Sequence, residues 1–385
     1  MMVHSIMTNM PNIDFAHRIE KVRARMEAQG LDVLVATKLG SRHYLAGTLL
    51  PWRSAIVIPR RGDVSLTTTS IDSERVAYDT WIKNVRPWEL ALRGPSMAEV
   101  VAQIISDGGF VSGVVGLETD DFTMNEHQEL TRRLNVKLED ASSLVDSVML
   151  IKEPAEIERM RRAAEVCDLA AEAVIKFIRP GVMETEIAGV VEQATRAAGS
   201  QWNWAVTGGT EVGSGYRQSF ARGWSQPATT KRGQRGDIVT IDIHPLIDLY
   251  CGDLAFNVCV GKPTEEQRKL EKVWREAIDT MLQNMKPGVV IGDAARRTRK
   301  VIKDAGLDEY ASSLLRHGLG TDSKMPPVVS EVNETVFEEN MFVELVVNIT
   351  VPRIGGMRTE SMVLVTKDGP DLLTRTPLEL ISVEP

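Results

Sequence analysis

The side chains with the clearest chemical potential are gathered in one stretch, residues 240–360. Three carboxylates and one imidazole lie there beside apolar, β-branched runs that are typical of buried strands: Asp242, Asp253, His317 and Glu360. A buried carboxylate is costly unless it is paired or binds a metal. Because the four groups lie on different predicted strands of one core, we predict that they form a metal cluster.

Two kinds of scaffold surround this stretch. Up to about residue 148, short apolar strands alternate with helices, which predicts an α/β domain with a substantially parallel sheet. Within it, residues 54–69 are predicted to form a hairpin around Arg61-Gly62-Asp63, and SRHYLAGT (41–48) a turn. Long helical segments follow from Pro154 and Met183, and strands and further helices complete the chain. We place the domain boundary near residue 150, giving domains 1–150 and 151–385.

Length, charge and cysteine content narrow the class of protein. A chain of 385 residues predicts about two domains. A net charge of −8 argues against a general nucleic-acid binder, because phosphate contacts need a basic surface. No apolar run approaches the roughly 20 residues that span a bilayer, so we expect no membrane segment. The N-terminus lacks the pattern of a signal peptide, and three cysteines without a CxxC pair favour a reduced, cytoplasmic compartment.

Several motifs in order give the chain a family resemblance. GDIVTIDIHPLIDLYCGDLAF carries the two aspartates, RHGLGTD the histidine and GGMRTESMVLVT the last glutamate. Together with RIEKVRARMEAQGLDVLVAT near the start and IKEPAEIERMRRAAEVCDLA after residue 150, they resemble the pita-bread family of creatinase, aminopeptidase P and prolidase. The resemblance covers nearly the whole length. It implies an α/β N-terminal domain followed by an α+β pita-bread catalytic domain.

The resemblance also implies a chemistry. In the peptidases of this family, two Asp, one His and two Glu hold two divalent metals, and Asp242, Asp253, His317 and Glu360 match four of these positions. Oxygen-rich ligands of this kind accommodate Mn, Co, Fe or Zn, as one or two ions. We therefore expect a metal-dependent hydrolase of a small amide, dipeptide or related C–N bond. The resemblance further implies a homodimer.

The sequence departs from the peptidase pattern at several positions. Val346 stands where the fifth ligand, a Glu, is expected, and Glu344 lies two residues earlier on the same strand face, either as a substitute ligand or as an ion-paired or solvated residue. Lys324 replaces a family histidine and is either an oxyanion-binding cation or a solvated lysine. Ser225 occupies the position of the creatinase base, which disfavours that mechanism. His244 shares a strand face with Asp242, and is either an extra metal ligand or base or a core histidine.

The substrate side is predicted from aromatic and basic residues ahead of the aspartates. They could form an aromatic pocket with a carboxylate clamp, or serve ordinary packing and surface charge: Trp202, Tyr216, Arg217, Arg222 and Trp224.

Two other functions stay open at this point. One is a metal-dependent lyase that resembles the family's dimethylsulfoniopropionate lyase, which also lacks the second histidine. The other is a non-catalytic binding module on a degenerate pita-bread fold. Retention of four metal-ligand residues argues against the binding module.

Overall fold

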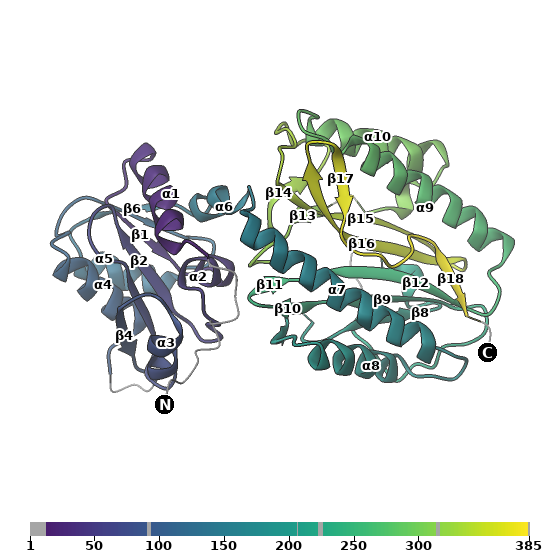
Figure 1. Cartoon of the computed structure of the whole chain (residues 1–385), viewed down its shortest axis with the longest axis horizontal. Coiled ribbons are helices and arrows are strands. Elements are labelled where there is room, and N and C mark those ends of the chain that lie inside the picture. Colours follow the sequence, from purple (N-terminus) through teal and green to yellow (C-terminus); the bar gives the residue numbers. More distant parts are fainter. Residues whose placement is uncertain (1–12, 91–93, 206, 222–225, 313–315, 384–385) are drawn as a thin grey trace. The chain divides into compact units, whose positions relative to one another are not determined.

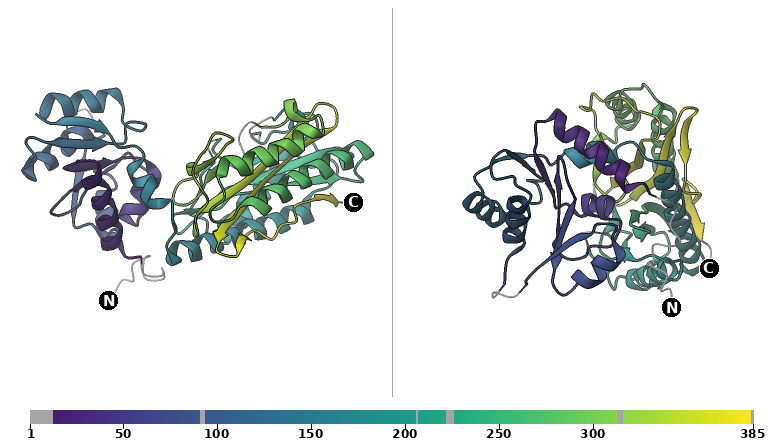
Figure 2. Two further views of the ribbon diagram at one scale, coloured as in Figure 1. Left: turned by 90° about the horizontal axis from the view of Figure 1, so that it is seen from above. Right: turned by 60° about the vertical axis from the view of Figure 1, so that its left-hand side comes forward.

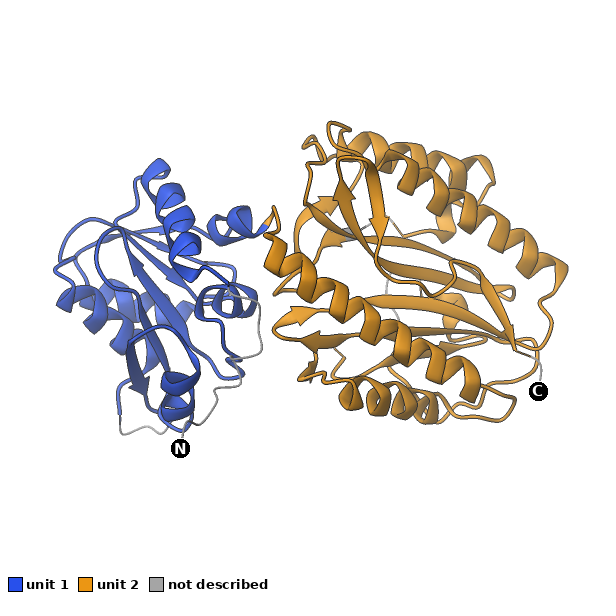
Figure 3. Ribbon diagram, in the orientation of Figure 1, with its two compact units in different colours: residues 1–149 blue, residues 150–385 orange. Residues whose placement is uncertain are grey.

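The chain divides into two compact units. The computed structural model describes residues 13–90, 94–205, 207–221, 226–312 and 316–383. Unit 1 is Met1–Met149 and unit 2 is Leu150–Pro385, coloured blue and orange in Figure 3. Each unit has hydrophobic cores of its own and is described by itself.

Unit 1 is built on a six-stranded sheet in the order β4-β3-β2-β1-β5-β6 (Figure 1). Its strands are β1 Val33–Ala36, β2 Ala55–Pro59, β3 Ser65–Thr69, β4 Asn84–Trp88, β5 Val114–Leu117 and β6 Lys137–Asp140. Its helices are α1 Phe15–Ala28, α2 Leu39–Ala46, α3 Ser73–Asp79, α4 Met97–Asp107, α5 Met124–Arg133 and α6 Leu144–Met149.

The pairing of these strands is mixed. Strand β1 pairs parallel with β5, β5 with β6, and β3 with β4, whereas β1–β2 and β2–β3 are antiparallel. The β2–β3 pair is the hairpin predicted around Arg61-Gly62-Asp63. The segment predicted as a turn at residues 41–48 instead lies largely within helix α2, so that prediction is wrong.

Unit 2 contains a large sheet in the order β14-β13-β15-β16-β12-β9-β8, with β17 beside β16 and β18 beside β12. Unit 2 also contains a small sheet in the order β11-β10-β7, whose strands β10 and β11 lie between β9 and β12 in the sequence. The strands are β7 Trp202–Asn203, β8 Glu211–Ser214, β9 Ile238–Ile243, β10 Pro245–Ile247, β11 Tyr250–Cys251, β12 Leu254–Val260, β13 Arg316–Gly318, β14 Met325–Val329, β15 Phe342–Val351, β16 Gly355–Thr366, β17 Gly369–Leu372 and β18 Leu380–Val383. The helices are α7 Pro154–Phe177, α8 Glu184–Ala197, α9 Glu265–Asn284 and α10 Ile291–Asp304, with 3-10 turns η2 Gln218–Phe220 and η3 Asp308–Tyr310.

Two helix pairs pack on the large sheet. Helices α7 and α8 form one core with β9 and β12, and α9 and α10 form a second core with β15 and β16. The views in Figure 2 show α9 and α10 (green) running along the strands of this unit. The sequence dictates where these helices begin. Pro154 occupies the first turn of α7, and Thr264 and Gln267 form a capping box at the start of α9.

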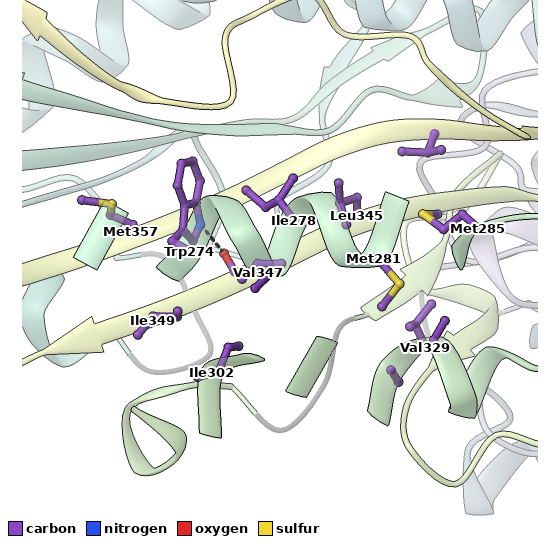
Figure 4. Packing of buried hydrophobic residues seen from close by; sticks show 14 of the residues in the cluster. Trp274, Ile278, Met281, Met285, Ile302, Val329, Leu345, Val347, Ile349 and Met357 are labelled. Atoms are coloured by element: carbon purple, nitrogen blue, oxygen red, sulfur yellow. Dashed lines mark hydrogen bonds between the residues drawn. The ribbon is translucent and has the colours of Figure 1, made fainter. Parts of the chain in front are cut away.

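The packing under α9 fixes which face of β15 is apolar. Leu345, Val347 and Ile349 point toward α9, and the indole Nε1–H of Trp274 donates to the carbonyl oxygen of Val347 at 3.0 Å (Figure 4). Because side chains alternate along a strand, the intervening residues Glu344 and Val346 face the opposite side of the sheet. The candidate site lies on that opposite side.

Candidate metal centre

The strand register brings the predicted ligands into transverse rows on the face away from the helices. Across β15, β16, β12, β9 and β8, one row of directly paired residues consists of Val346, Glu360, Ala255, Asp242 and Glu211. Direct partners in an antiparallel pair point to the same face. Two carboxylates therefore flank the methyl group of Ala255 within this row.

The next row adds four polar groups. Asp253 is two residues before Ala255 and His244 is two residues after Asp242, so both share the face of the first row. Glu344 pairs with Met362 on the same face. Gly318 pairs with Val343, and this antiparallel register places His317 opposite Glu344.

Four of these residues converge on a volume that suits a metal ion. Asp242, His244, Asp253 and Glu360 are buried, and each offers one ligand atom within 4.8 Å of all the others. The Nε2 atom of His244 lies 3.1 Å from Asp242 Oδ1 and 3.8 Å from Asp253 Oδ1. Neither carboxylate oxygen of Asp253 accepts a hydrogen bond from a described residue. A buried, unbonded carboxylate is costly, so the donor set fits a bound cation.

Arg358 is a part of the site that the sequence analysis missed. It is buried on β16, where its Nε–H donates to Asp242 Oδ2 at 3.2 Å and its Nη2–H to Glu360 Oε1. Its backbone N–H donates to Asn257 Oδ1 at 3.0 Å, which fixes the strand position. The guanidinium therefore orients two predicted ligands from outside. Its position two residues before Glu360, on the same strand face, was the available signal.

The two aspartates experience opposite electrostatic environments. Burial works against ionisation of Asp242, but His244 and Arg358 nevertheless hold the pKa of this carboxyl below its usual range. Burial raises the pKa of Asp253 well above its usual value, and the negative charges of Glu360 and Glu344 raise it further. A cation at this point would reverse the effect on Asp253, because it favours the ionised carboxylate.

The predicted metal ligand His317 and the predicted catalytic residues Glu344 and Lys324 are not among the four clustered residues. Both carboxylate oxygens of Glu344 are buried, and within the described part of the chain neither has a hydrogen-bond partner. Burial, followed by the charges of Glu360 and Asp242, raises the pKa of this carboxyl well above its usual value. His317 is half-buried, with Nδ1 3.0 Å from the carbonyl oxygen of Gly318. Lys324 is exposed just before β14. Their predicted roles as ligand, base or oxyanion binder stay predictions.

Glu211 is a second site residue that the sequence analysis missed. It pairs directly with Asp242, is buried, and accepts a hydrogen bond from Thr207 Oγ1 at 2.8 Å. Burial, followed by the charge of Asp242, raises the pKa of its carboxyl. Only the register of β8 against β9 reveals its position, and no local sequence pattern encodes that register.

The predicted substrate residues have different surroundings. Trp202 is half-buried on β7 and Tyr216 is exposed, with Lys231 Nζ 5.8 Å from its ring centre. Arg217 is engaged in structure: it pairs with the buried carboxylate of Glu184 and donates from Nη2 to the carbonyl oxygen of Pro227 at 2.8 Å. Arg222 and Trp224 lie outside the described residues.

Comparison with known proteins agrees with this geometry. Residues 158–367 match metallopeptidase family M24, and residues 18–150 match the creatinase/prolidase N-terminal domain. An Xaa-Pro dipeptidase of Pyrococcus horikoshii is 33% identical over 255 residues, which cover 66% of this chain and 71% of that protein. An Xaa-Pro dipeptidase of Pyrococcus furiosus is 28% identical over 366 residues, 94% of this chain and 99% of the relative. The structure of an Xaa-Pro dipeptidase from Bacillus anthracis superimposes with a TM-score of 0.84 at 26% identity, covering 96% of this chain and 100% of that one.

The fold and the ligand cluster define the class of pita-bread metallohydrolases. The chain belongs to metallopeptidase family M24. The predicted family, the predicted fold and the prediction of a metal-dependent hydrolase are thereby confirmed. None of the helices among the described residues is long and apolar enough to cross a lipid bilayer.

Proposed function

We propose that this protein is a metal-dependent dipeptidase of the prolidase type. The observation that supports the proposal most directly is the convergence of Asp242, His244, Asp253 and Glu360 within 4.8 Å of one another on one face of the sheet. Relatives that cover nearly the whole chain are Xaa-Pro dipeptidases, which supports a dipeptide as the substrate.

We propose these four residues as the ligands of the metal. A divalent cation held there would polarise the scissile carbonyl and lower the pKa of a water molecule. Arg358 keeps the outer oxygens of Asp242 and Glu360 oriented, and burial excludes bulk water from the ligands. Carboxylates with one imidazole suit Mn, Co, Fe or Zn.

Glu344 and His317 are proposed as a second group that serves the reaction. Their cross-strand placement supports a role in holding a second ion, in which Glu344 stands in for the ligand lost at Val346. The balance of charged groups also supports a second ion, because the described residues on this face include more buried acids than guanidinium groups. The acids are Asp242, Asp253, Glu211, Glu344 and Glu360, and the guanidinium group is that of Arg358.

The test is a comparison of metal content and dipeptide hydrolysis between the full chain and Asp253→Asn. We expect the wild-type chain to retain a stoichiometric divalent metal and to cleave Xaa-Pro dipeptides. Asp253→Asn should lose the metal and lower kcat/KM by roughly 100-fold, because loss of a group that merely supports a ligand already costs about 10–100-fold and this variant removes a proposed ligand itself. Asp279→Asn, an exposed acid on α9, is the matched control. Full activity of Asp253→Asn would reject the assignment.

The type of reaction has a separate test. Hydrolysis of a peptide bond in heavy-oxygen water places one solvent oxygen in the new carboxyl group, whereas elimination places none. Mass spectrometry of the products distinguishes the two. Unlabelled products from a metal-dependent turnover would favour the lyase.

We further propose that the protein is a cytoplasmic homodimer. The family resemblance supports the dimer, and three free, buried cysteines support a reducing compartment. Sedimentation equilibrium at micromolar concentration should give twice the chain mass of 42.6 kDa. A single species at the chain mass would contradict the dimer.

A further inference from the structure

Two proposed ligands lie at the base of one hairpin. His244 stands between β9 and β10, and Asp253 follows β11 and precedes β12, so β10 and β11 form the arms that join them. The Gly252 N–H donates to the Pro245 carbonyl oxygen at 2.8 Å and closes this base. The relative position of the two ligands therefore depends on how firmly the two arms are held together.

Trp204 contacts both arms of this base. Its backbone N–H donates to the carbonyl oxygen of His244 at 3.2 Å, and its indole Nε1–H donates to the carbonyl oxygen of Gly252 at 2.9 Å. Gly252 immediately precedes Asp253. One residue thus forms a hydrogen bond to the segment of each ligand.

The same indole also packs on the imidazole. The ring centroids of Trp204 and His244 are 4.5 Å apart at an interplanar angle of 77°, an edge-to-face contact. Such contacts contribute roughly 0.5–1.5 kcal/mol beyond area burial and depend on ring orientation. The contact restricts rotation of the imidazole, whose Nε2 faces the carboxylates of Asp242 and Asp253.

The base of the hairpin is closely packed around Gly252. A Cβ on Gly252 would lie 2.8 Å from Pro245 Cγ, 2.9 Å from Cys167 Sγ and 3.0 Å from the Ala163 carbonyl oxygen. The base is therefore already closely packed against α7 on one side. Trp204 restrains it through its two hydrogen bonds and its ring contact.

We infer that Trp204 is a positioning residue of the metal centre, which holds the His244 imidazole and the Asp253 segment in ligand geometry. This inference rests on the proposed ligand role of His244. It predicts that Trp204 acts on metal affinity through His244 and Asp253, without touching the metal. Outer groups that orient ligands typically account for 10–100-fold in metal affinity.

The test uses Co²⁺ as the probe with the full chain. Apoprotein of the wild type, Trp204→Phe and Trp204→Leu is titrated while the visible absorption of bound Co²⁺ is recorded. We expect Trp204→Leu to weaken the Co²⁺ Kd at least about 10-fold and to shift the absorption bands. Trp204→Phe, which keeps a ring but loses the indole donor, should fall between. Trp81→Phe is the matched control and should bind Co²⁺ as the wild type does, because Trp81 is a half-buried tryptophan of unit 1 whose indole also donates to a backbone carbonyl oxygen.

A double variant separates this inference from the proposed function. If Trp204 acts largely through His244, loss of the indole should matter little once the imidazole is gone. The Co²⁺ Kd of Trp204→Leu/His244→Ala should therefore exceed that of His244→Ala by much less than the factor measured for Trp204→Leu alone. Fully multiplicative losses, or an unchanged Kd in Trp204→Leu, would overturn the inference while leaving the metal site intact. Failure of the wild type to bind Co²⁺ at all would overturn the proposed function instead. Thermal unfolding of each apoprotein shows whether a variant is folded.

Discussion

At the scale of single residues, the proposed site is a set of buried carboxylates whose cost a bound cation would offset. Asp253 and Glu344 are buried, and no described residue donates a hydrogen bond to their carboxylate oxygens. Neighbouring Val346 is apolar and lies directly opposite Glu360. Relative to the peptidase pattern given in the sequence analysis, Val346 removes one carboxylate from the row that contains Glu360 and Asp242. Glu344 supplies a carboxylate in the adjacent row.

Val346→Glu tests that balance. It adds a buried carboxylate directly opposite Glu360, where like charges repel, so the metal-free protein should lose on the order of 2 kcal/mol or more of stability. Added Mn²⁺ or Co²⁺ should restore more stability to this variant than to the wild type. Thermal unfolding with a chelator and with metal measures both effects. Val346→Gln, of similar size and uncharged, is the control, and equal losses in the two variants under chelator would contradict the charge explanation.

Sequence patterns predicted the candidate site residues that belong to local motifs. Asp242, Asp253 and Glu360 were predicted from their strands, and His244 from its spacing of two from Asp242. Arg358 has the same spacing from Glu360, but it was missed because arginine does not bind metals and a search for metal ligands passes over it. Glu211 could not be found, because its place beside Asp242 depends on the pairing of β8 with β9.

At the scale of elements, helix α2 shows why local patterns are insufficient. The segment SRHYLAGT was predicted as a turn, and helix α2 covers most of it. In the structure, the buried carboxylate of Glu118, which follows β5, accepts hydrogen bonds from the backbone N–H groups of Thr37 and Lys38 and from Ser41 Oγ. The group that stabilises the helix start is therefore about 80 residues away in sequence, as the contact separations of 77 to 81 show.

Glu118 also predicts a pH dependence for the stability of unit 1. Burial raises the pKa of its carboxyl to about 7 from an ordinary 4.5, despite the hydrogen bonds from Ser41, Lys38 and Thr37. The folded state therefore binds more protons than the unfolded state between these values, so this group's contribution to stability falls as the pH rises from 4.5 to 7.

The variant Glu118→Gln removes this titration while retaining an amide oxygen for the backbone donors. We expect it to be more stable relative to the wild type at pH 8 than at pH 5, by on the order of 2–3 kcal/mol. Urea unfolding at the two pH values measures the difference. Glu74→Gln, an exposed acid in α3, is the control, and a difference that does not change with pH would contradict the explanation.

At the scale of the whole molecule, the residues of the proposed centre all come from unit 2. The cores of unit 2 are formed by helices α7 to α10 and the large sheet. The described core of unit 1 contains none of the residues of the proposed centre. The boundary predicted near residue 150 rested on the end of the alternating strands and helices. We propose that the two units are separate domains divided at that point.

Expression of residues 150–385 alone tests this proposal. The fragment should fold cooperatively and bind Co²⁺ with the stoichiometry and absorption spectrum of the full chain, because every proposed ligand is retained. Circular dichroism and metal titration provide the measurements. A fragment that is unfolded, or folded but unable to bind Co²⁺ when the full chain does, would show that the division is not a domain boundary.

Ala255 has a consequence that concerns how readily such a site is lost. It lies between Glu360 and Asp242, whose strands are about 9–10 Å apart across β12, and its small side chain leaves room for both carboxylates to approach one point. A branched residue there would fill that room while every liganding group stayed in place. Replacement of Ala255 by a branched residue would thus abolish metal binding in a protein that keeps all of its acids and histidines.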